Sequence, residues 1–282
     1  MRFARLHVAA AVVFLGLASG GAVIAGAQHS PSYPDATPQL PRAAPSAPDA
    51  GFGWADRLAA ATRFAAQRTG DVGFAVIDEH GTLRSYHPDA RFESASVVKV
   101  MLMAAYLRQA SVSDRELDDA DRRLLAPMIK QSANGPASEI YQRVGAGAFY
   151  ELAREAGMKG FSTSPFWGAS TITARGQARF LYELERYLPE RHRDYALGLM
   201  ADIVAPQRWG IPHALPLGFS IHFKGGWAPE DGAWKINQVA LLVNGERRLS
   251  LAVLTRGNPS PGYGHATVRG IAERLLHSYE YH

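Results

Sequence analysis

The sequence predicts an α+β fold, a three-layer α/β/α sandwich with a five-stranded antiparallel sheet, flanking helices and an inserted all-helical lobe. Two observations predict it. Strand-like stretches lie near both ends of the domain, and a long run of helical pattern separates them. The first and last stretches of the domain carry apolar residues at helical spacing, so helices can cover the sheet. None of the 282 residues is cysteine, so this fold forms without disulfides.

The first fifty residues are predicted to lie outside the domain. Arg2 and Arg5 precede an uncharged stretch, 8–27, that is rich in Ala, Val, Leu and Gly. Its small residues and its end at Ala-Gly-Ala are typical of signal-peptide cleavage, so 1–27 is predicted to be a signal peptide. About 20 apolar residues also suffice for an uncleaved N-terminal anchor. Residues 28–50 are rich in Pro, Ala and Ser and are predicted to be a disordered linker to a domain at 51–282.

The domain is predicted to begin with a helix and a hairpin. Residues 54–67 have apolar residues at helical spacing, and Gly70 ends that helix. Residues 72–77 form a strand-like run, and 78–81 form a turn into a second strand at 83–87.

Helical patterns then dominate. Residues 96–108 are strongly apolar, as in a buried helix. Further helices are predicted at 118–131, 146–155 and 174–187, which places the helical lobe at about 112–205. Three strands follow at 220–227, 233–243 and 248–256, with Asn244-Gly245 as a hairpin turn, and a final helix is predicted at 265–279. A site at the junction of lobe and sheet is expected.

A serine and a lysine at the start of the buried helix are candidates for nucleophilic chemistry. Ser96 would lie near unpaired backbone N–H groups, and Lys99 follows three residues later on the same face. Burial would lower the pKa of Lys99 so that its neutral amine could accept the serine proton. When the pair is taken alone, a helix-capping serine beside a lysine explains it better than catalysis does.

Two further motifs follow: Ser132-Ala133-Asn134 in the helical block, and Lys224-Gly225-Gly226 on a strand. Together with Ser96-x-x-Lys99, they resemble the three motifs of class A β-lactamases and penicillin-binding proteins. The order of elements over 51–282 also resembles that β-lactamase/transpeptidase-like fold.

The resemblance implies a role for each motif residue. Ser96 would attack a carbonyl carbon and form an acyl-enzyme, while Lys99 takes its proton. Ser132 would pass a proton to the leaving nitrogen, and Lys224 would hold Ser132 and attract a substrate carboxylate. Asn134 would orient Lys99 and contact a substrate amide. The strand backbone at Gly226 and Trp227 would bind substrate, with the N–H groups of Ser96 and Trp227 forming an oxyanion hole.

The sequence departs from the family pattern at three places. Ala133 replaces an Asp of the second motif, and Gly225 replaces the Thr or Ser of the third, whose hydroxyl helps to bind a carboxylate. Arg256 is an alternative carboxylate ligand or an exposed strand-end charge. No Asp or Glu occurs between Glu155 and Glu183, where class A enzymes carry the Ω-loop Glu that activates water. We therefore expect a poor class A β-lactamase.

Other functions are less consistent with the sequence. The net charge is +4, but the arginines are scattered, so no nucleic-acid partner is expected. Ten histidines form no metal-ligand motif, so neither a metal nor a cofactor is expected. His222 lies two residues before Lys224 and could line the cleft or face a helix. A Ser-His-Asp triad stays possible, although no Gly-x-Ser-x-Gly motif is present.

The sequence therefore predicts an exported β-lactamase-like serine hydrolase, secreted or attached to the cell envelope. Its partner would be a β-lactam or a peptidoglycan-like amide. It would contact a membrane only through residues 8–27 if these are uncleaved, and it would be a monomer. The alternatives are a non-hydrolytic penicillin- or peptide-binding protein with little turnover, and a structural envelope protein. The structural role gives no reason for two of only five lysines to occupy motif positions.

Overall fold

The structure is a computed structural model that describes residues 53–279. The predicted signal peptide or anchor at 1–27 and the linker at 28–50 lie outside the described residues. No helix between residues 53 and 279 is both long and apolar enough to cross a membrane.

The described part of the chain alternates between helices and strands. The α-helices are α1 (Trp54–Ala66), α2 (Lys99–Leu107), α3 (Ala110–Ser113), α4 (Asp119–Lys130), α5 (Asn134–Glu155), α6 (Ala174–Tyr182), α7 (Arg193–Ala201) and α8 (Pro261–Leu276). The strands are β1 (Asp71–Ile77), β2 (Leu83–Tyr86), β3 (Arg91–Glu93), β4 (Thr171–Thr173), β5 (Ser220–Glu230), β6 (Ala233–Asn244) and β7 (Arg247–Asn258). Short 3-10 turns are η1 (Ala95–Val98), η2 (Trp167–Ala169), η3 (Leu184–Tyr187), η4 (Glu190–His192), η5 (Ala205–Gln207) and η6 (Ile211–Ala214).

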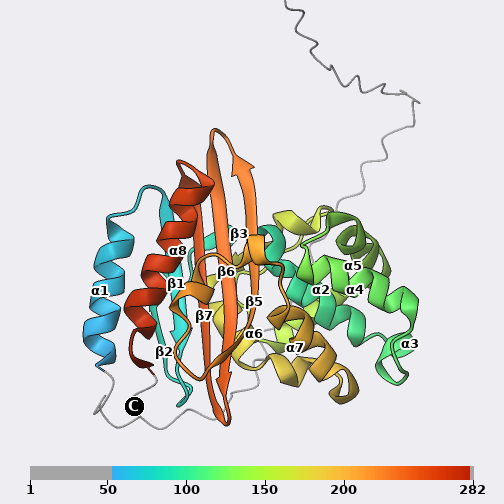
Figure 1. Cartoon of the computed structure of the whole chain (residues 1–282). Helices are drawn as coiled ribbons and strands as arrows, with labels where there is room; N and C mark the ends of the chain where they lie inside the picture. Colours follow the sequence, from blue (N-terminus) through green and yellow to red (C-terminus); the bar gives the residue numbers. More distant parts are fainter. Residues whose placement is uncertain (1–52, 280–282) are drawn as a thin grey trace, which may run out of the picture. The chain divides into compact units, whose positions relative to one another are not determined.

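The main sheet has five antiparallel strands in the order β2-β1-β7-β6-β5, as the sequence predicts. The pairing of β1 with β7 joins the two ends of the domain into one sheet. Helices α1 and α8 pack together beside this sheet, and the lobe helices lie on its other side (Figure 1). The order leaves β5 as an edge strand next to the lobe, which places the third motif at the boundary between sheet and helices.

The connection from α1 to β1 needs a glycine. Gly70 has a φ of +86°, and a Cβ there would lie 2.1 Å from the backbone oxygen of Arg256. Only glycine adopts this conformation and leaves room for such a close approach. The six residues after Asp71 in β1 are all buried, as expected for an inner strand covered on both faces.

Helix α2 forms the centre of the helical lobe. All nine of its residues are buried, and α4 and α5 pack against it. Helix α4 starts with a capping box in which the carboxylates of Asp118 and Asp121 each accept the other's backbone N–H. Helix α5 bends at Gly145, where φ is +71°. The motif residue Lys99 thus begins a rigid, fully buried helix.

Three local features differ from the sequence prediction. Ser96 lies in the 3-10 turn η1, and the α-helix itself starts only at Lys99. The final helix starts at Pro261, earlier than predicted, because Ser260 caps it and accepts the N–H of Tyr263. Helix α6 belongs to the stretch predicted for the lobe but packs on β1, β6 and β7, where the Ser250 hydroxyl donates to the oxygen of Ala178.

The small sheet of β3 and β4 was not predicted. Its three residue pairs are centred on Phe92 and Ile172, both buried. Two strands of three residues have too short a pattern to detect. The pairing matters because it brings the loop after Phe166 next to the turn that carries Ser96.

Candidate active site

The turn that carries Ser96 is fixed from two sides. Asn237 on β6 donates from Nδ2 to the oxygens of Glu93 (2.8 Å) and Ser94 (3.3 Å). The Ser94 N–H donates to the oxygen of Ser170 in the neighbouring loop (2.8 Å). Ala95 has a φ of +46°, an unfavourable conformation for alanine that these contacts hold in place. The backbone before the candidate nucleophile is therefore positioned by both the sheet and the loop.

Lys99 is fully buried, and its amine contacts the second motif. Nζ donates to the backbone oxygen of Ser132 (2.5 Å), to Ser132 Oγ (3.3 Å) and to Asn134 Oδ1 (2.9 Å). Ser132 has a φ of +60°, which turns its oxygen and hydroxyl to the same amine. Within residues 53–279, no hydrogen bond joins Lys99 Nζ to Ser96 Oγ. Catalytic hydrogen bonds are often long in free enzymes and shorten when substrate binds, so the absence of this bond does not exclude Lys99 as the base for Ser96.

Burial lowers the pKa of Lys99 from 10.5 to about 7. The Trp167 ring lies over the amine, with its centroid 4.7 Å from Nζ, and the indole N–H donates to Ser138 Oγ at 3.1 Å. An indole excludes water from this side of the amine without supplying a full negative charge. The neutral form of Lys99 is thus abundant at neutral pH, which a base needs.

Lys224 approaches the same hydroxyl from β5. Its Nζ donates to Ser132 Oγ (3.0 Å) and to the oxygen of Gly225 (2.9 Å). Ser132 Oγ therefore accepts from two lysine amines, and its own proton is free to go to a ligand. Burial first, and the charge of Lys99 second, hold the pKa of Lys224 well below its usual range.

Gly226 lets the strand backbone approach Ser96 closely. A Cβ on Gly226 would lie 2.7 Å from the Ser96 nitrogen and 2.9 Å from the Val97 nitrogen. The Val97 N–H donates to the Ser94 oxygen (3.3 Å), whereas the first N–H group of a helical turn, here that of Ser96, has no partner within the turn and can bind a ligand oxygen. The next residue along β5 is Trp227, whose backbone N–H the family resemblance assigns to the oxyanion hole together with that of Ser96.

The structure brings together Lys99, Ser132, Asn134 and Lys224 by hydrogen bonds, and it places Ser96 against Gly226. Their individual roles stay predictions. Sequence reasoning missed Trp167 over Lys99 and Asn237 behind the Ser96 turn. It also missed Trp209, whose ring lies against Gly225. Trp167 could have been found from the sequence, because Phe166-Trp167-Gly168 lies inside the stretch that has no carboxylates.

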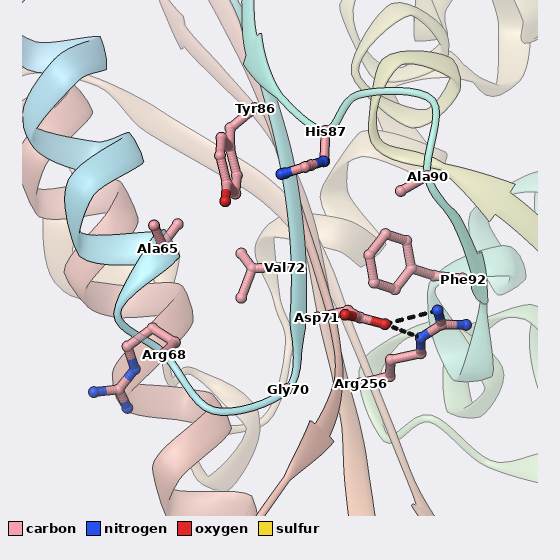
Figure 2. Close-up of a pocket in the computed structure, with 11 residues that line it drawn as sticks. Ala65, Arg68, Gly70, Asp71, Val72, Tyr86, His87, Ala90, Phe92 and Arg256 are labelled. Carbon is pink, nitrogen blue, oxygen red and sulfur yellow. Dashed lines mark hydrogen bonds and ion pairs between the residues drawn. The ribbon is translucent and has the colours of Figure 1, made fainter.

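Two alternatives from the sequence are settled by contacts. His222 Nδ1 lies 2.9 Å from the oxygen of Leu197, so this histidine faces α7. Arg256 is 51% exposed at its side chain and bonds to Asp71 at 2.7 Å (Figure 2). Arg256 is therefore an exposed, paired strand-end charge.

A hollow of about 280 Å³ lies near α1 and strands β1 to β3, and no residue of the three motifs lines it (Figure 2). Its polar lining includes Arg68, Asp71, His87 and Arg256. Arg68 donates to Thr267 (2.8 Å), and Arg256 donates to Asp71 (2.7 Å). Among the described residues, no cluster of three or more His, Asp or Glu side chains could hold a metal ion.

Comparison with known proteins gives a family match and similar folds. The model of the "Beta-lactamase enzyme family" matches residues 55–120 and 121–279. A β-lactamase from Sphaerobacter thermophilus is 20% identical, with a TM-score of 0.70 over 82% of this chain and 99% of its own. A class A β-lactamase representative from Bacteroides cellulosilyticus is 14% identical, with a TM-score of 0.71 over 81% and 99%. A β-lactamase from Xanthomonas campestris is 18% identical, with a TM-score of 0.64 over 78% and 96%. None of the curated proteins compared with the chain matches it.

Proposed function

Because the chain belongs to the beta-lactamase enzyme family, we propose that Ser96 forms an acyl-enzyme with a β-lactam or a cell-wall peptide-like amide. The observation that carries the proposal is the pair of buried lysines, Lys99 and Lys224, that both donate to Ser132 Oγ. Two cations held together without a neighbouring carboxylate are unfavourable in a fold unless one of them works as a neutral amine.

Acylation follows from these contacts. The three donations from Lys99 Nζ, to the Ser132 oxygen, to Ser132 Oγ and to Asn134 Oδ1, need the charged form with three N–H bonds. In neutral Lys99 the two remaining N–H bonds go to the Ser132 oxygen and to Asn134 Oδ1, which accept only. The donation to Ser132 Oγ is then absent, and the lone pair is left to take the Ser96 proton. Ser96 Oγ then forms a bond to the carbonyl carbon, and the oxyanion binds the backbone N–H groups of Ser96 and Trp227.

The leaving nitrogen needs a proton when its bond to the carbonyl carbon breaks. Ser132 Oγ donates its proton to that nitrogen and regains one from the ammonium of Lys99, 3.3 Å away. Lys224, at 3.0 Å, keeps the hydroxyl oriented. Lys99 returns to its neutral form, so the acylation half-reaction balances.

Release of the acyl group is the weak step. Class A enzymes use the Ω-loop Glu at this point, whereas here the Trp167 ring lies over Lys99 and the stretch 156–182 has no Asp or Glu. Lys99 is then the remaining base for water. We propose slow hydrolysis, and the same observation favours the second candidate, a penicillin- or peptide-binding protein with little turnover.

We also propose that the protein acts outside the cytoplasm. The support is the sequence of residues 8–27, which has the composition and the small-residue end of a signal peptide. Cell-wall peptides are accessible in that compartment.

The experiment is labelling of the protein with a fluorescent penicillin and with a chromogenic activated ester. Wild type and Ser162→Ala, which removes an exposed serine, should be labelled, and Ser96→Ala should not. Lys99→Ala should slow labelling by about 100-fold or more, the usual contribution of a general base, while Lys159→Ala, at an exposed lysine, should not.

Two outcomes would separate the candidates. If wild type turns over substrate and Lys99→Ala abolishes this turnover, the binding-protein hypothesis is excluded. That hypothesis predicts that Lys99→Ala leaves the ligand affinity nearly unchanged. The enzyme hypothesis fails if neither probe labels Ser96.

A further inference from the structure

The space beside Gly225 is filled by the side chain of Trp209. A Cβ on Gly225 would lie 2.9 Å from Cζ2 and 3.2 Å from Cη2 of that indole. Any side chain at position 225 would therefore strike the ring. The Gly225 oxygen also accepts from Lys224 Nζ, so the indole lies against the residue that follows Lys224 on the edge strand β5.

Trp209 is held in this place by Gln238. The Gln238 amide donates from Nε2 to the Trp209 oxygen (2.7 Å), and its Oε1 accepts the N–H of Ile211 (2.6 Å). Gln238 is fully buried and pairs with Gly225 across β5 and β6, so the two residues share a face of the sheet. Gly210, which lies between Trp209 and Ile211 in the chain, has a φ of +72°, and a Cβ there would lie 2.4 Å from Gln238 Oε1. The loop is thus built around the amide.

Other aromatic rings extend the surface. Trp209 stacks on His265 of α8, with centroids 4.1 Å apart and planes at 15°. Its centroid is 6.3 Å from that of Trp227, at 77°. Trp227 is 37% exposed and shares a face of β5 with Gly225. The face of β5 at Gly225, one residue after Lys224, is therefore aromatic and partly open to solvent.

The Lys and Arg side chains considered as partners for a carboxylate here already have other hydrogen-bond or ion-pair partners. Lys224 is fully buried and donates to Ser132 and Gly225. Arg256 is bonded to Asp71. Arg208 precedes Trp209 but donates to the Ala201 oxygen at 3.0 Å and lies over Phe223, with the guanidinium 5.3 Å from the ring centroid. Burial lowers the pKa of His265, which stacks on Trp209, so that this ring is mostly neutral at pH 7. A carboxylate placed beside Gly225 would meet an indole and lose its hydration without gaining an ionic partner.

We propose that Trp209, positioned by Gln238, is a specificity-determining residue that excludes a substrate carboxylate from the space beside Gly225. The site then takes uncharged acyl donors with an apolar or aromatic group in preference to anionic penicillins. The inference rests on the proposed acylation of Ser96.

The test compares the rates at which two probes acylate Ser96: a fluorescent penicillin, which carries a carboxylate, and the uncharged p-nitrophenyl ester of phenylacetic acid. In wild type the ester should react faster, relative to each probe's rate of hydrolysis in buffer. Trp209→Ala should shift the ratio toward penicillin by about tenfold or more, which corresponds to one ordinary polar contact. Trp209→Ala combined with Gly225→Thr should shift it further, because the threonine hydroxyl then has room.

The controls separate specificity from folding. Gly225→Thr alone should slow both probes, since its side chain meets the indole. Gln238→Met, which removes both hydrogen bonds to the loop, should shift the ratio in the same direction as Trp209→Ala. Trp234→Phe, on the neighbouring strand, should leave the ratio as in wild type. Thermal melting of each variant checks that it is folded.

The possible results are distinguishable. Equal relative rates in wild type, or a ratio that Trp209→Ala leaves unchanged, would overturn the inference and leave the proposed function intact. Labelling of Ser96 by neither probe would refute the proposed function and the inference with it. A ratio that shifts in Trp209→Ala and in the double variant, but not in Trp234→Phe, supports it.

Discussion

The acylation rate should depend on pH through Lys99. Its pKa of about 7 makes about half of the amine neutral at pH 7. An exposed lysine with a pKa near 10.5 would be neutral in only about 0.03% of molecules, so burial increases the active form by about three orders of magnitude. The lysine must be neutral to accept the serine proton, so the rate should be constant well above pH 7. It should fall tenfold per pH unit below it, to about 1% at pH 5.

The assay is time-resolved labelling of Ser96 by the uncharged ester between pH 5 and pH 9, in buffers of constant ionic strength. Trp167→Ala admits water to the amine, so it should move the midpoint upward, toward 10.5. Phe166→Ala removes an exposed ring next to it and should leave the midpoint in place. A wild-type rate that still rises steeply at pH 9, or a midpoint that Trp167→Ala does not move, would refute the reasoning.

Three further predictions use other contacts. Gly226→Ala should reduce the acylation rate by about 100-fold, because its Cβ would displace the Ser96 N–H. The control Gly198→Ala, at an open helical position, should leave the rate unchanged. Equal rates in the two variants would contradict the oxyanion-hole assignment. Trp167→Glu should release a preformed acyl group faster than Trp167→Gln does. The measurement is the rate at which the adduct mass disappears from the protein. Equal rates of release would show that a carboxylate at this position does not activate water. Asp121→Asn should destabilise the fold by about 2 kcal/mol in urea titrations at pH 7, since Arg115, Tyr106 and the Asp118 N–H all donate to that carboxylate.

The Asp121 prediction has its own pH dependence. Burial opposes ionisation, but the donors more than compensate, and they lower the pKa of Asp121 from 3.8 to about 2. A lowered carboxyl pKa stabilises the fold above pH 3.8 and loses that effect as the pH falls toward 2. The difference between wild type and Asp121→Asn should therefore narrow between pH 4 and pH 2, and a constant difference would contradict the assignment.

Much of the fold could be predicted because long periodic segments dominate it. The order of helices and strands, the sheet built from both ends of the domain and the hairpin between β6 and β7 follow from apolar spacing and turn residues, although the turn itself is Gly245-Glu246, one residue later than predicted. The β3–β4 pair could not be predicted, because its stability comes from Phe92 and Ile172 meeting across the fold. The 3-10 turn at Ser96 depends on Asn237, which is distant in sequence.

The motif residues of the site could also be predicted, because three short motifs occur in the order, and on the kinds of element, that the family resemblance requires. Trp167, Trp209 and Gln238 could not, because tryptophan and glutamine are as common in cores as in sites. Their importance comes from position: the Trp167 ring 4.7 Å from Lys99 Nζ, and the Trp209 ring where a side chain of residue 225 would lie. The sequence indicated that the Ω-loop Glu and the hydroxyl at position 225 are missing. The structure shows that Trp167 lies in the first region and Trp209 in the second.

The most direct measurement is peptide mapping by tandem mass spectrometry after brief exposure to the uncharged ester and to penicillin. The account predicts an adduct on the peptide that contains Ser96, with the added mass on that residue, and a lifetime long enough to survive digestion. Ser96→Ala should carry no adduct. An adduct on another residue, or the same labelling in Ser96→Ala, would contradict the central claim that Ser96 is the nucleophile.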